Sequence, residues 1–363
     1  MTTTEFLLLN LTSIKETYNK SEIPKNPTEF NYFAAFLIIV LSIVGLSGNA
    51  LTVFALWKYP RARGPTANFI ISLCVADFLY CAWNLPFTVS EYIIQKWIYG
   101  DIFCILYPFV QYVNSALSLL LVTAVTINRY ILIAHKNVYE NIYQRRYIGL
   151  MIVVIWLFTF SLLVPTLAGV WGRFGYDEKL LACSIVEVNG QSPKAFLFII
   201  GFIIPTFTII FCYARIFWVV KRSSKRLRNH SKGEVKEQKN RDTKKRKEEW
   251  RLTRMILIIF CSFILCFLPQ TVIKVTDKNV RYPVLHTLGY ILIYTSSCIN
   301  PIIYGVTNKQ YREAYKSVLC RTRPKRTSVL YNVSPSNENS SSQSPPHSNI
   351  SQSTKGSEIN EQV

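Results

Sequence analysis

Seven long stretches of mainly apolar residues limit this chain to a membrane fold. A bilayer core about 30 Å thick is crossed by about 20 apolar residues in a helix. Half of the 363 residues are hydrophobic although the formal net charge is +20, because the charged residues gather between the apolar stretches. The predicted helices occupy residues 31–57, 66–94, 103–136, 146–170, 195–220, 252–275 and 283–306.

We therefore expect an all-α membrane protein. It would comprise an N-terminal segment over 1–30, a seven-transmembrane bundle over 31–306 and a short amphipathic eighth helix over 307–320. The tail over 321–363 is rich in Ser, Asn and Gln and is predicted to be disordered. Its serines are candidate phosphorylation sites.

The distribution of Lys and Arg predicts the orientation. Cytoplasmic loops carry an excess of these residues, and here the connections over 58–63, 136–146 and 221–251 are basic, whereas the alternate connections have mixed charge. A multi-pass plasma-membrane protein with an extracellular N-terminus and a cytoplasmic C-terminus follows. The basic run over 243–247 would then contact anionic lipid or an acidic partner, or form a solvated helix extension, rather than bind nucleic acid.

Three kinds of covalent modification follow from this orientation. Asn10 and Asn19 begin glycosylation sequons on the outer side. Among the nine cysteines, only Cys104 and Cys183 are placed where an oxidising compartment reaches them, which predicts one disulfide. Cys320 ends the amphipathic segment and is a candidate for a palmitoyl anchor.

Asp77 is the one acidic residue expected near the middle of the membrane. Polar groups there are costly and by default suggest function. The side chains that could join it in an oxygen-rich sodium site are Asn49, Ser118, Ser296, Ser297 and Asn300. The alternative is a purely structural hydrogen-bond network around a neutral Asp77. No other cofactor is expected.

An ordered set of short motifs identifies a family. The chain resembles the rhodopsin-like, class A G-protein-coupled receptors over about residues 31–320. The motifs are Gly48-Asn49, Ala76-Asp77, Trp97 with Gly100 and Cys104, Asn128-Arg129-Tyr130, Trp156, Pro205, Tyr213, Cys266-Phe267-Leu268-Pro269 and Asn300-Pro301-Ile302-Ile303-Tyr304. Within the family the chain is most similar to the insect trapped-in-endoderm and moody receptor group, and more distantly to melatonin receptors. That resemblance implies a role in guiding cell migration or polarity.

The resemblance also implies a switch at the cytoplasmic end. Arg129 would be held against Glu249 at rest and released when the sixth helix swings outward about Pro269, which opens a cleft for a heterotrimeric G protein. A receptor kinase and arrestin would follow as partners. The residues assigned to the switch are Asn128, Arg129, Tyr130, Tyr213, Glu249, Phe267, Pro269, Asn300, Pro301 and Tyr304.

The ligand pocket is expected to open outward and to carry few charges. Its predicted lining is Tyr107, Gln111, Tyr112, Ser115, Phe267, Gln270, Tyr290 and Tyr294, several of which could simply pack helices together. Gln111 stands where amine receptors have an Asp, so an uncharged or lipid-like ligand is favoured over an amine. Asn128 replaces the usual acid, and Phe267 replaces the common Trp.

Other classes of function fit less well. A melatonin-like or peptide-binding receptor of the same family stays open as an alternative. A retinal pump would have a lysine in the seventh helix, and a transporter would show internal repeats and several mid-membrane charges. The chain has neither these features nor a phosphate-binding loop, nucleophile elbow or His/Cys metal cluster, so an enzyme is not expected.

Overall fold

The computed structural model describes residues 26–59, 65–178, 182–230, 236–277 and 280–320 of the chain. Helices account for most of this part. In chain order the elements are α2 (Thr28–Lys58), α3 (Pro65–Ile94), α4 (Gly100–Ala134), α5 (Lys136–Ile142), α6 (Arg145–Leu167), β1 (Arg173–Asp177), β2 (Ala182–Val186), α7 (Lys194–Phe198), the π-helix η2 (Ile199–Ile203), α8 (Ile204–His230), α9 (Lys236–Thr276), α10 (Pro283–Thr307) and α11 (Lys309–Leu319).

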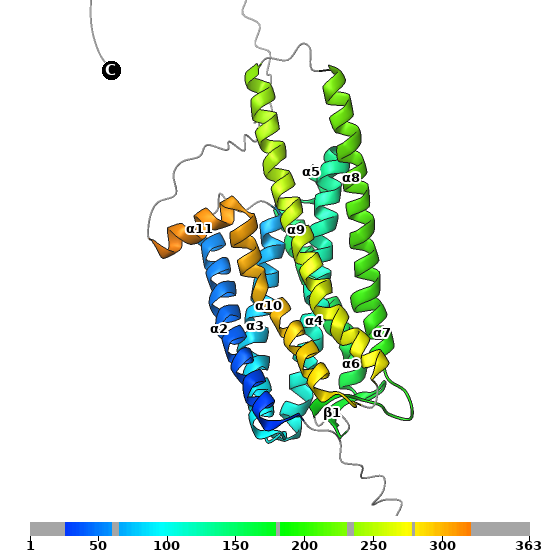
Figure 1. Ribbon diagram of the computed structural model, residues 1–363. Coiled ribbons are helices and arrows are strands. Elements are labelled where there is room, and N and C mark those ends of the chain that lie inside the picture. The colour runs from blue at the N-terminus through cyan, green and yellow to red at the C-terminus, as the bar shows by residue number, and fades with distance from the viewer. Residues whose placement is uncertain (1–25, 60–64, 179–181, 231–235, 278–279, 321–363) are drawn as a thin grey trace, which may run out of the picture. The chain divides into compact units, whose positions relative to one another are not determined.

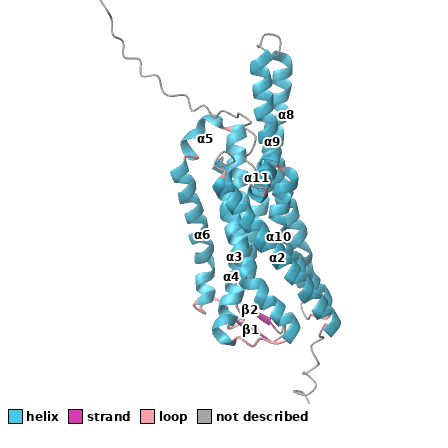
Figure 2. Ribbon diagram, turned by 90° about the vertical axis from the view of Figure 1, so that its left-hand side faces the viewer, coloured by secondary structure: helices cyan, strands magenta, loops and turns pink. Residues whose placement is uncertain are grey.

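Seven long helical segments form a bundle, with α7, η2 and α8 together making the fifth. At one end of the bundle lies a two-stranded antiparallel hairpin in which Tyr176 pairs with Cys183. At the other end α11 lies across the bundle, and α8 and α9 extend past the remaining helices (Figures 1 and 2). The two ends are therefore chemically and structurally different.

The surface of the bundle is apolar, as lipid contact requires. Of the described helices, six are long and apolar enough to cross a membrane. In the most hydrophobic window of α6 only 17% of the residues are buried, and Leu157, Phe207 and Leu265 are among the exposed apolar side chains. Apolar residues on the outside need no protein partner when the surrounding solvent is hydrocarbon.

The seventh segment, α10, is less apolar because one side of it carries polar groups. Its buried residues include His286, Ser296, Ser297 and Asn300. Packed against α2, α3 and α9, these side chains face other helices rather than lipid. The bundle therefore confirms the predicted seven-helix fold.

Prolines interrupt the backbone hydrogen bonding of several spans. Pro86, Pro108, Pro165, Pro269 and Pro301 all lie inside helices, where each removes one N–H donor and favours a kink. The fifth segment adjusts differently, since the wide turn of η2 immediately precedes Pro205. Tertiary packing keeps all of these helices continuous in spite of the prolines.

The fifth and sixth helices are longer than the sequence analysis predicted. They were expected to end near residue 220 and to begin near residue 252, but α8 continues to His230 and α9 begins at Lys236. The added turns contain the basic run, and Lys, Arg, Glu and Gln are good helix formers that need no apolar partner. The predicted limits fell short because hydropathy marks the membrane limit of a helix and not its end. The helix extension expected as one alternative for the basic run is what the structure shows.

Candidate functional site

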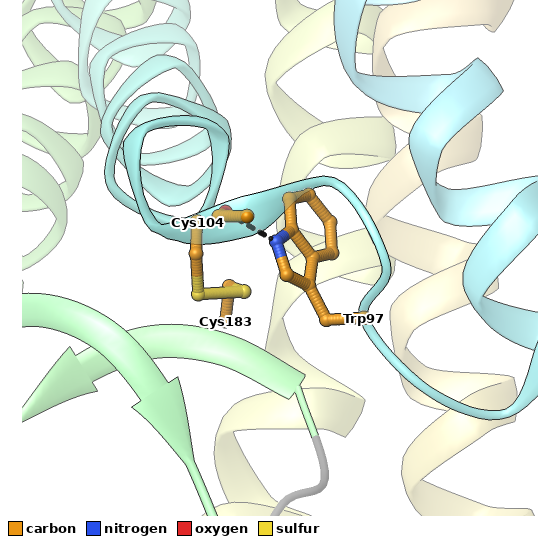
Figure 3. Close-up of a disulfide and its surroundings, with 4 residues drawn as sticks. Trp97, Cys104 and Cys183 are labelled. Carbon is orange, nitrogen blue, oxygen red and sulfur yellow. Dashed lines mark hydrogen bonds between the residues drawn. A yellow bond between two sulfur atoms is a disulfide. The ribbon is translucent and has the colours of Figure 1, made fainter.

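A disulfide fixes the end of the bundle opposite α11. Cys104, at the start of α4, is bonded to Cys183 on β2, which confirms the predicted pair (Figure 3). Both cysteines are buried next to Trp97, whose indole N–H donates a hydrogen bond of 2.8 Å to the Gly100 carbonyl. The hairpin is thereby tied to the first turns of α4.

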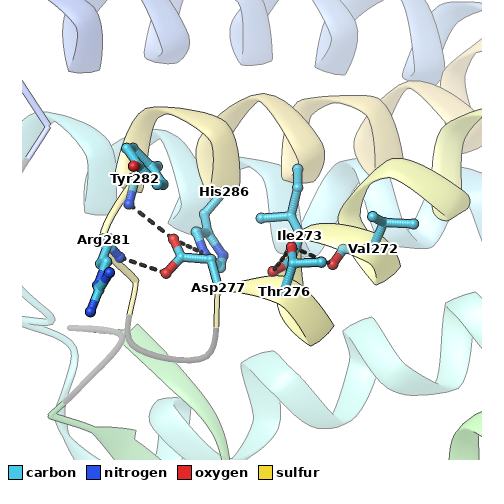
Figure 4. A network of polar contacts seen from close by, with 7 residues as sticks. All are labelled: Val272, Ile273, Thr276, Asp277, Arg281, Tyr282 and His286. Carbon is cyan, nitrogen blue, oxygen red and sulfur yellow. Dashed lines mark hydrogen bonds and ion pairs between the residues drawn. The ribbon is translucent and has the colours of Figure 1, made fainter.

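A second polar cluster holds the connection between α9 and α10. Asp277 accepts hydrogen bonds of 2.9 Å from the backbone N–H groups of Arg281 and Tyr282, and its carboxylate lies 3.2 Å from Nε2 of His286 (Figure 4). Hydrogen bonds to the charged form, led by those from the two backbone N–H groups, lower the pKa of Asp277. The cluster lies at the hairpin end of the bundle and closes the connection between the sixth and seventh spans.

Tyr107 of α4 lies beside the disulfide, and two tyrosines of α10 lie within electrostatic range of Tyr107. Tyr107 is buried, its hydroxyl lies 2.9 Å from that of Thr88, and its carbonyl accepts a hydrogen bond from Asn84. On α10 the rings of Tyr290 and Tyr294 stack with centroids 6.3 Å apart. Tyr107 is therefore fixed by α3, and it packs helices together whether or not it also touches a ligand.

Ser115 and Phe267 line one narrow cavity below this aromatic layer. The Phe267 ring stacks on Phe263 with centroids 4.1 Å apart. The Ser115 hydroxyl donates to the carbonyl of Gln111 on its own helix at 2.9 Å, and Tyr112 packs against β1. Of the eight predicted lining residues, the structure thus brings these two to the cavity floor.

Gln270 is buried against α10 without satisfying its polar atoms. A Cβ added at Gly289 would collide with its amide oxygen, so a larger residue there would require the Gln270 side chain to move. Neither amide atom of Gln270 has a hydrogen-bond partner in the part of the chain that the structure describes. An unpaired buried amide is costly, and a ligand offering one donor and one acceptor would relieve that cost.

Two charged side chains near this region were missed by the sequence analysis, which expected few charges. Lys274 on α9 lies with its ammonium 5.0 Å from the centre of the Tyr290 ring. Glu91 on α3 has a buried carboxylate oxygen with no hydrogen-bond partner among the described residues. Their position inside spans was the available signal, because an ionisable residue there is a functional candidate.

Asp77 lies at the centre of a polar network in the middle of the bundle. It is fully buried and accepts hydrogen bonds from Asn300 at 2.9 Å and from Ser118 at 3.3 Å. Asn114 donates to the Ser297 hydroxyl at 3.0 Å and extends the network. Asn114 was not predicted, although it precedes Ser118 by one helical turn on the same face of α4.

Asn49 and Ser296, two further residues predicted for the sodium site, differ in whether they bond to another helix. The amide of Asn49 donates to the carbonyls of Gly45 and Ser297, at 2.9 and 3.0 Å. The Ser296 hydroxyl instead donates to the Ile293 carbonyl of its own helix at 2.7 Å. The network therefore joins α2, α3, α4 and α10, with Ser296 at its margin.

The donor atoms of this network suit a hard cation. Besides the carboxylate of Asp77, the amide oxygens of Asn49 and Asn114 are buried and have no hydrogen-bond partner among the described residues, and oxygen ligands are those that hard cations prefer. The adjoining cavity, lined by Ser118 and Ser297 among others, leaves no room for a water-sized sphere. Side chains would therefore have to rotate to admit an ion.

At the opposite end of α4, Arg129 is buried near helices from both sides of the bundle. Its exposed fraction is 5%, and it lies close enough to Tyr213 on α8 and Tyr311 on α11 for electrostatic interaction. Tyr130 instead points toward His135, with its hydroxyl 3.4 Å from the Nε2 atom of that residue. Of Arg129 and Tyr130, only Arg129 therefore points toward the centre of the helix bundle.

Asn128 connects three elements at this end. It is fully buried, its amide oxygen accepts a hydrogen bond of 3.0 Å from Thr66 on α3, and its amide nitrogen donates to the Tyr139 hydroxyl on α5 at 3.4 Å. A neutral amide can accept from one neighbour and donate to the other at once. Asn128 therefore satisfies both neighbours, Thr66 as a donor and Tyr139 as an acceptor.

The remaining switch residues lie around α9. The Tyr213 hydroxyl donates to the Thr253 carbonyl at 3.1 Å and joins α8 to α9. Tyr304 is fully buried, and its hydroxyl has no hydrogen-bond partner among the described residues. Glu249 is exposed one turn before Thr253, so its expected contact with Arg129 stays a prediction.

Comparison with known proteins decides the family. The sequence model of the family described as 7 transmembrane receptor (rhodopsin family) matches residues 48–304. The chain belongs to this family. The relatives of this receptor are G-protein-coupled receptors, which confirms both the predicted family and the prediction that it is not an enzyme.

Similar receptors occur in insects and vertebrates. G-protein coupled receptor moody of Drosophila melanogaster is 43% identical over 79% of this chain and 51% of its own length, so this receptor spans about half of moody. Protein trapped in endoderm-1 of the same species is 37% identical over 80% of this chain and 78% of its own length. Melatonin receptor type 1A of Mus musculus is more distant, at 26% identity over 84% of each chain.

Among solved structures, squid rhodopsin has the same fold. The TM-score is 0.76 at 24% sequence identity, over 83% of this receptor and 88% of the rhodopsin chain. This likeness concerns the arrangement of the helices and not the ligand.

The helix that follows α10 is docked to the receptor's first span. The hydroxyls of Tyr315 on α11 and Thr52 on α2 are 2.7 Å apart, and the Tyr59 hydroxyl donates to the Ser317 carbonyl. Cys320, next to the last residue of α11, is exposed, as palmitoylation would require. The predicted glycosylation sites and the Ser-rich tail lie outside the described residues.

Proposed function

We propose that this receptor transmits the binding of an extracellular ligand to a heterotrimeric G protein. The observation that carries the proposal is the burial of Arg129 at the end of α4, close to Tyr213 and Tyr311. Outward movement of a neighbouring helix would uncover this guanidinium and make it available to a partner protein. The arrangement is consistent with a closed state from which the partner site opens.

The proposed opening is an outward movement of the cytoplasmic part of α9. It would break the hydrogen bond between Tyr213 and the Thr253 carbonyl, and Pro269 inside α9 supplies a flexible point for the movement. The phenol of Tyr213 and that of Tyr304 could then turn toward the vacated space. A ligand drives this change only by binding the open state more tightly than the closed one.

We also propose the plasma membrane as the location, with the hairpin end outside and the α11 end in the cytoplasm. The disulfide between Cys104 and Cys183 supports this orientation, because such bonds persist in oxidising compartments. The basic connections at the opposite end support it too. In that orientation receptor kinases, arrestin and inner-leaflet lipid would meet the tail and α11.

For the ligand we propose a lipid-like molecule rather than an amine. Gln111 offers no carboxylate to a cationic amine, and Phe263, Phe267 and Ile293 supply the apolar part of a cavity whose other lining residues are polar but uncharged. The similarity to Protein trapped in endoderm-1 supports a further proposal, that the receptor guides cell migration or polarity. The first proposal concerns the chemistry of the ligand, and the second concerns the cellular response to the signal.

A sodium ion is proposed as an allosteric ligand of the central network. The carboxylate of Asp77, the hydroxyls of Ser118 and Ser297 and the amide oxygens of Asn49 and Asn114 would hold it. A bound cation would neutralise Asp77 and hold α3, α4 and α10 together. These same side chains would otherwise serve as a structural hydrogen-bond network.

The decisive test of G-protein coupling is Arg129→Ala, measured with G-protein dissociation sensors in intact cells. We expect coupling to be lost while the surface level is largely retained, because Arg129 meets the partner rather than the apolar core. Arg146→Ala is the matched control, since Arg146 lies over the Tyr147 ring on the outside of the bundle. Undiminished signalling by Arg129→Ala would refute the proposal.

A further inference from the structure

One face of α8 is turned away from the bundle along the membrane span. Ile204, Phe207 and Phe211 are exposed on this face, three and four residues apart as neighbours on one side of a helix are. The other side of α8, which includes Ile209 and Ile216, is buried. In the most hydrophobic window of this fifth span only 17% of the residues are buried. The exposed face of α8 therefore meets lipid hydrocarbon.

The same face continues into a cation, an indole and a second cation. Arg215, Trp218 and Arg222 follow at the same helical spacing, and all three are exposed. The guanidinium carbon of Arg215 lies 5.4 Å from the centre of the Trp218 ring, and that of Arg222 lies 5.6 Å from it. Two positive charges thus converge on one aromatic ring at the lipid-facing surface.

No described carboxylate forms an ion pair with Arg215 or Arg222. Contact with an aromatic ring attracts a guanidinium group but leaves its charge in place and most of its N–H donors unused. The forked donors of arginine match the oxygens of a phosphate. An anion from outside the described receptor would therefore balance this pair of charges.

The position of the pair along α8 fits the headgroup layer of the membrane. The fifth apolar span ends at Arg222, and Arg215 lies about 10 Å before it along the helix axis. Tryptophan is enriched at the boundary between hydrocarbon and headgroups, and an arginine near a span end extends its guanidinium toward the headgroups. This end of α8 lies on the α11 side of the bundle (Figures 1 and 2), which is the inner leaflet in the orientation proposed above.

Other helices carry single cation–aromatic pairs at the same end. Lys58 lies over the Phe54 ring on α2, and Arg146 lies over the Tyr147 ring on α6. Each of these pairs supplies one charge. Among the described residues, Trp218 is the ring that two cations approach, so the charge is most concentrated there.

We propose that Arg215, Trp218 and Arg222 form a binding site for an anionic phospholipid of the inner leaflet. The two guanidinium groups hold the headgroup phosphate, the indole packs against the glycerol region, and the acyl chains lie along Phe211 and Phe207. A soluble anion would meet the same guanidinium groups without the apolar part of the face. The inference rests on the proposed orientation and adds a lipid site outside the helix bundle.

The test measures lipid binding to the purified full-length receptor in detergent, without G protein, by native mass spectrometry. Three lipids with the same two oleoyl chains are offered in equal amounts: phosphatidate, phosphatidylserine and phosphatidylcholine. Glycerol phosphate serves as the headgroup without chains. We expect the two anionic lipids to bind in preference to phosphatidylcholine, and glycerol phosphate to show no binding at the same concentration.

Charge variants then assign the site. Arg215→Gln and Arg222→Gln should each weaken phosphatidate binding roughly fivefold, the effect of one cation near an anionic lipid surface, and Arg215→Lys should retain most of it. Arg146→Gln on α6 removes the same charge from a single pair. It is the matched control and should bind like the wild type. The melting temperature of each variant without added lipid reports whether it folds.

Three outcomes would overturn the inference. Equal binding of phosphatidate and phosphatidylcholine would show that the headgroup charge is not recognised. Equal losses in Arg146→Gln and Arg215→Gln would show a diffuse attraction without a site, and binding of glycerol phosphate as strong as that of phosphatidate would show an anion site that needs no lipid. Because neither G protein nor a membrane with two sides is present, a failure here is distinct from failure of the Arg129→Ala test and from an error in the orientation.

Discussion

At the residue scale, we expect Asn128 to influence how firmly its neighbour Arg129 is held. The residue before Arg129 is a neutral amide with hydrogen bonds to Thr66 and Tyr139, so this neighbour in the sequence supplies no negative charge. A hydrogen bond to a charged group is worth about 1.5–3 kcal/mol. The resting state of this receptor should accordingly be less favoured than it would be with an acid at this position, and some signalling without ligand is expected.

Asn128→Asp should reduce that ligand-independent signalling. The hydroxyls of Thr66 and Tyr139 can both donate to the new carboxylate, so its hydrogen bonds are preserved while a charge is added beside Arg129. A gain of about 1.4 kcal/mol for the resting state lowers basal activity about tenfold. Thr66→Val is the control, because it removes one bond to Asn128 without adding charge. Basal signal in Asn128→Asp at or above the wild-type level, at equal surface density, would contradict the argument.

Asp277 gives a prediction about pH. Its pKa is lowered in the folded receptor by the N–H groups of Arg281 and Tyr282, so its contribution to stability is present above the unfolded pKa, about 3.9, and is lost as pH falls through the lower folded pKa. Asp277→Asn should melt at a lower temperature than the wild type at pH 7. The difference should shrink as the pH is lowered below about 4. A difference that is independent of pH would show that the charge is not involved.

Individual contacts were only partly predictable from the sequence. Asp77, Ser118 and Asn300 were expected together and form hydrogen bonds, since each is a polar residue in an apolar span. Asn114 and the position of Lys274 over the Tyr290 ring were missed, because a residue type does not tell which way a long or amide side chain turns. That choice depends on neighbours from helices distant in sequence.

At the element scale, the contact of α2 with α3 and α10 depends on Gly45. A Cβ at this position would meet the sulfur atoms of Cys81 and Cys298, which face each other 3.8 Å apart. Gly45→Ala should therefore destabilise the purified receptor by about 1–3 kcal/mol, the usual cost of overpacking. The measurement is the melting temperature, compared with Gly149→Ala, where nothing lies within 4 Å.

A second substitution shows whether the cysteine is the obstacle. Adding Cys81→Ala to Gly45→Ala removes the sulfur that the new methyl group would meet, and it should restore part of the lost stability. If the double variant is instead as unstable as the sum of the two single variants, the effect of Gly45→Ala does not come from this contact.

The helices themselves were predictable because their pattern is physical and local. Each span needs about 20 apolar residues, and the predicted limits of the first span, 31–57, lie within a turn of the observed Thr28–Lys58. The extensions of α8 and α9 were not predictable in this way, since polar helical turns outside the membrane leave no hydropathy signal. Their charged, helix-forming composition was the available signal, and a solvated helix extension was one of the predictions for the basic run.

At the scale of the whole molecule, orientation is the proposal that most needs a direct test. If residues 1–25 are extracellular, Asn10 and Asn19 can be glycosylated, and enzymatic deglycosylation should increase the gel mobility of the wild type. The same treatment should leave an Asn10→Gln, Asn19→Gln double variant unchanged. A mobility shift that persists in the double variant would place another sequon on the outer side and contradict the topology.

The seven-helix architecture followed from the sequence, whereas the ligand did not. Hydropathy and loop charge report how the chain meets the bilayer, and these forces act on every residue of a span. Ligand chemistry depends on a few side chains that converge from separate helices, such as Lys274 with Tyr290, and no pattern along the chain encodes their meeting.

The wide turn η2 changes the direction in which the later side chains of the fifth span point around the helix axis. A π-turn holds one more residue than an α-turn, so it offsets the angular position of every later side chain by the rotation of one residue, about 100°. Tyr213 lies after this offset and reaches the Thr253 carbonyl of α9. The residues before Ile199 and those after Ile203 therefore follow two different helical wheels. In this way a local irregularity near the start of the span sets the direction of a tyrosine several turns later, on the side of the bundle where α8 meets α9.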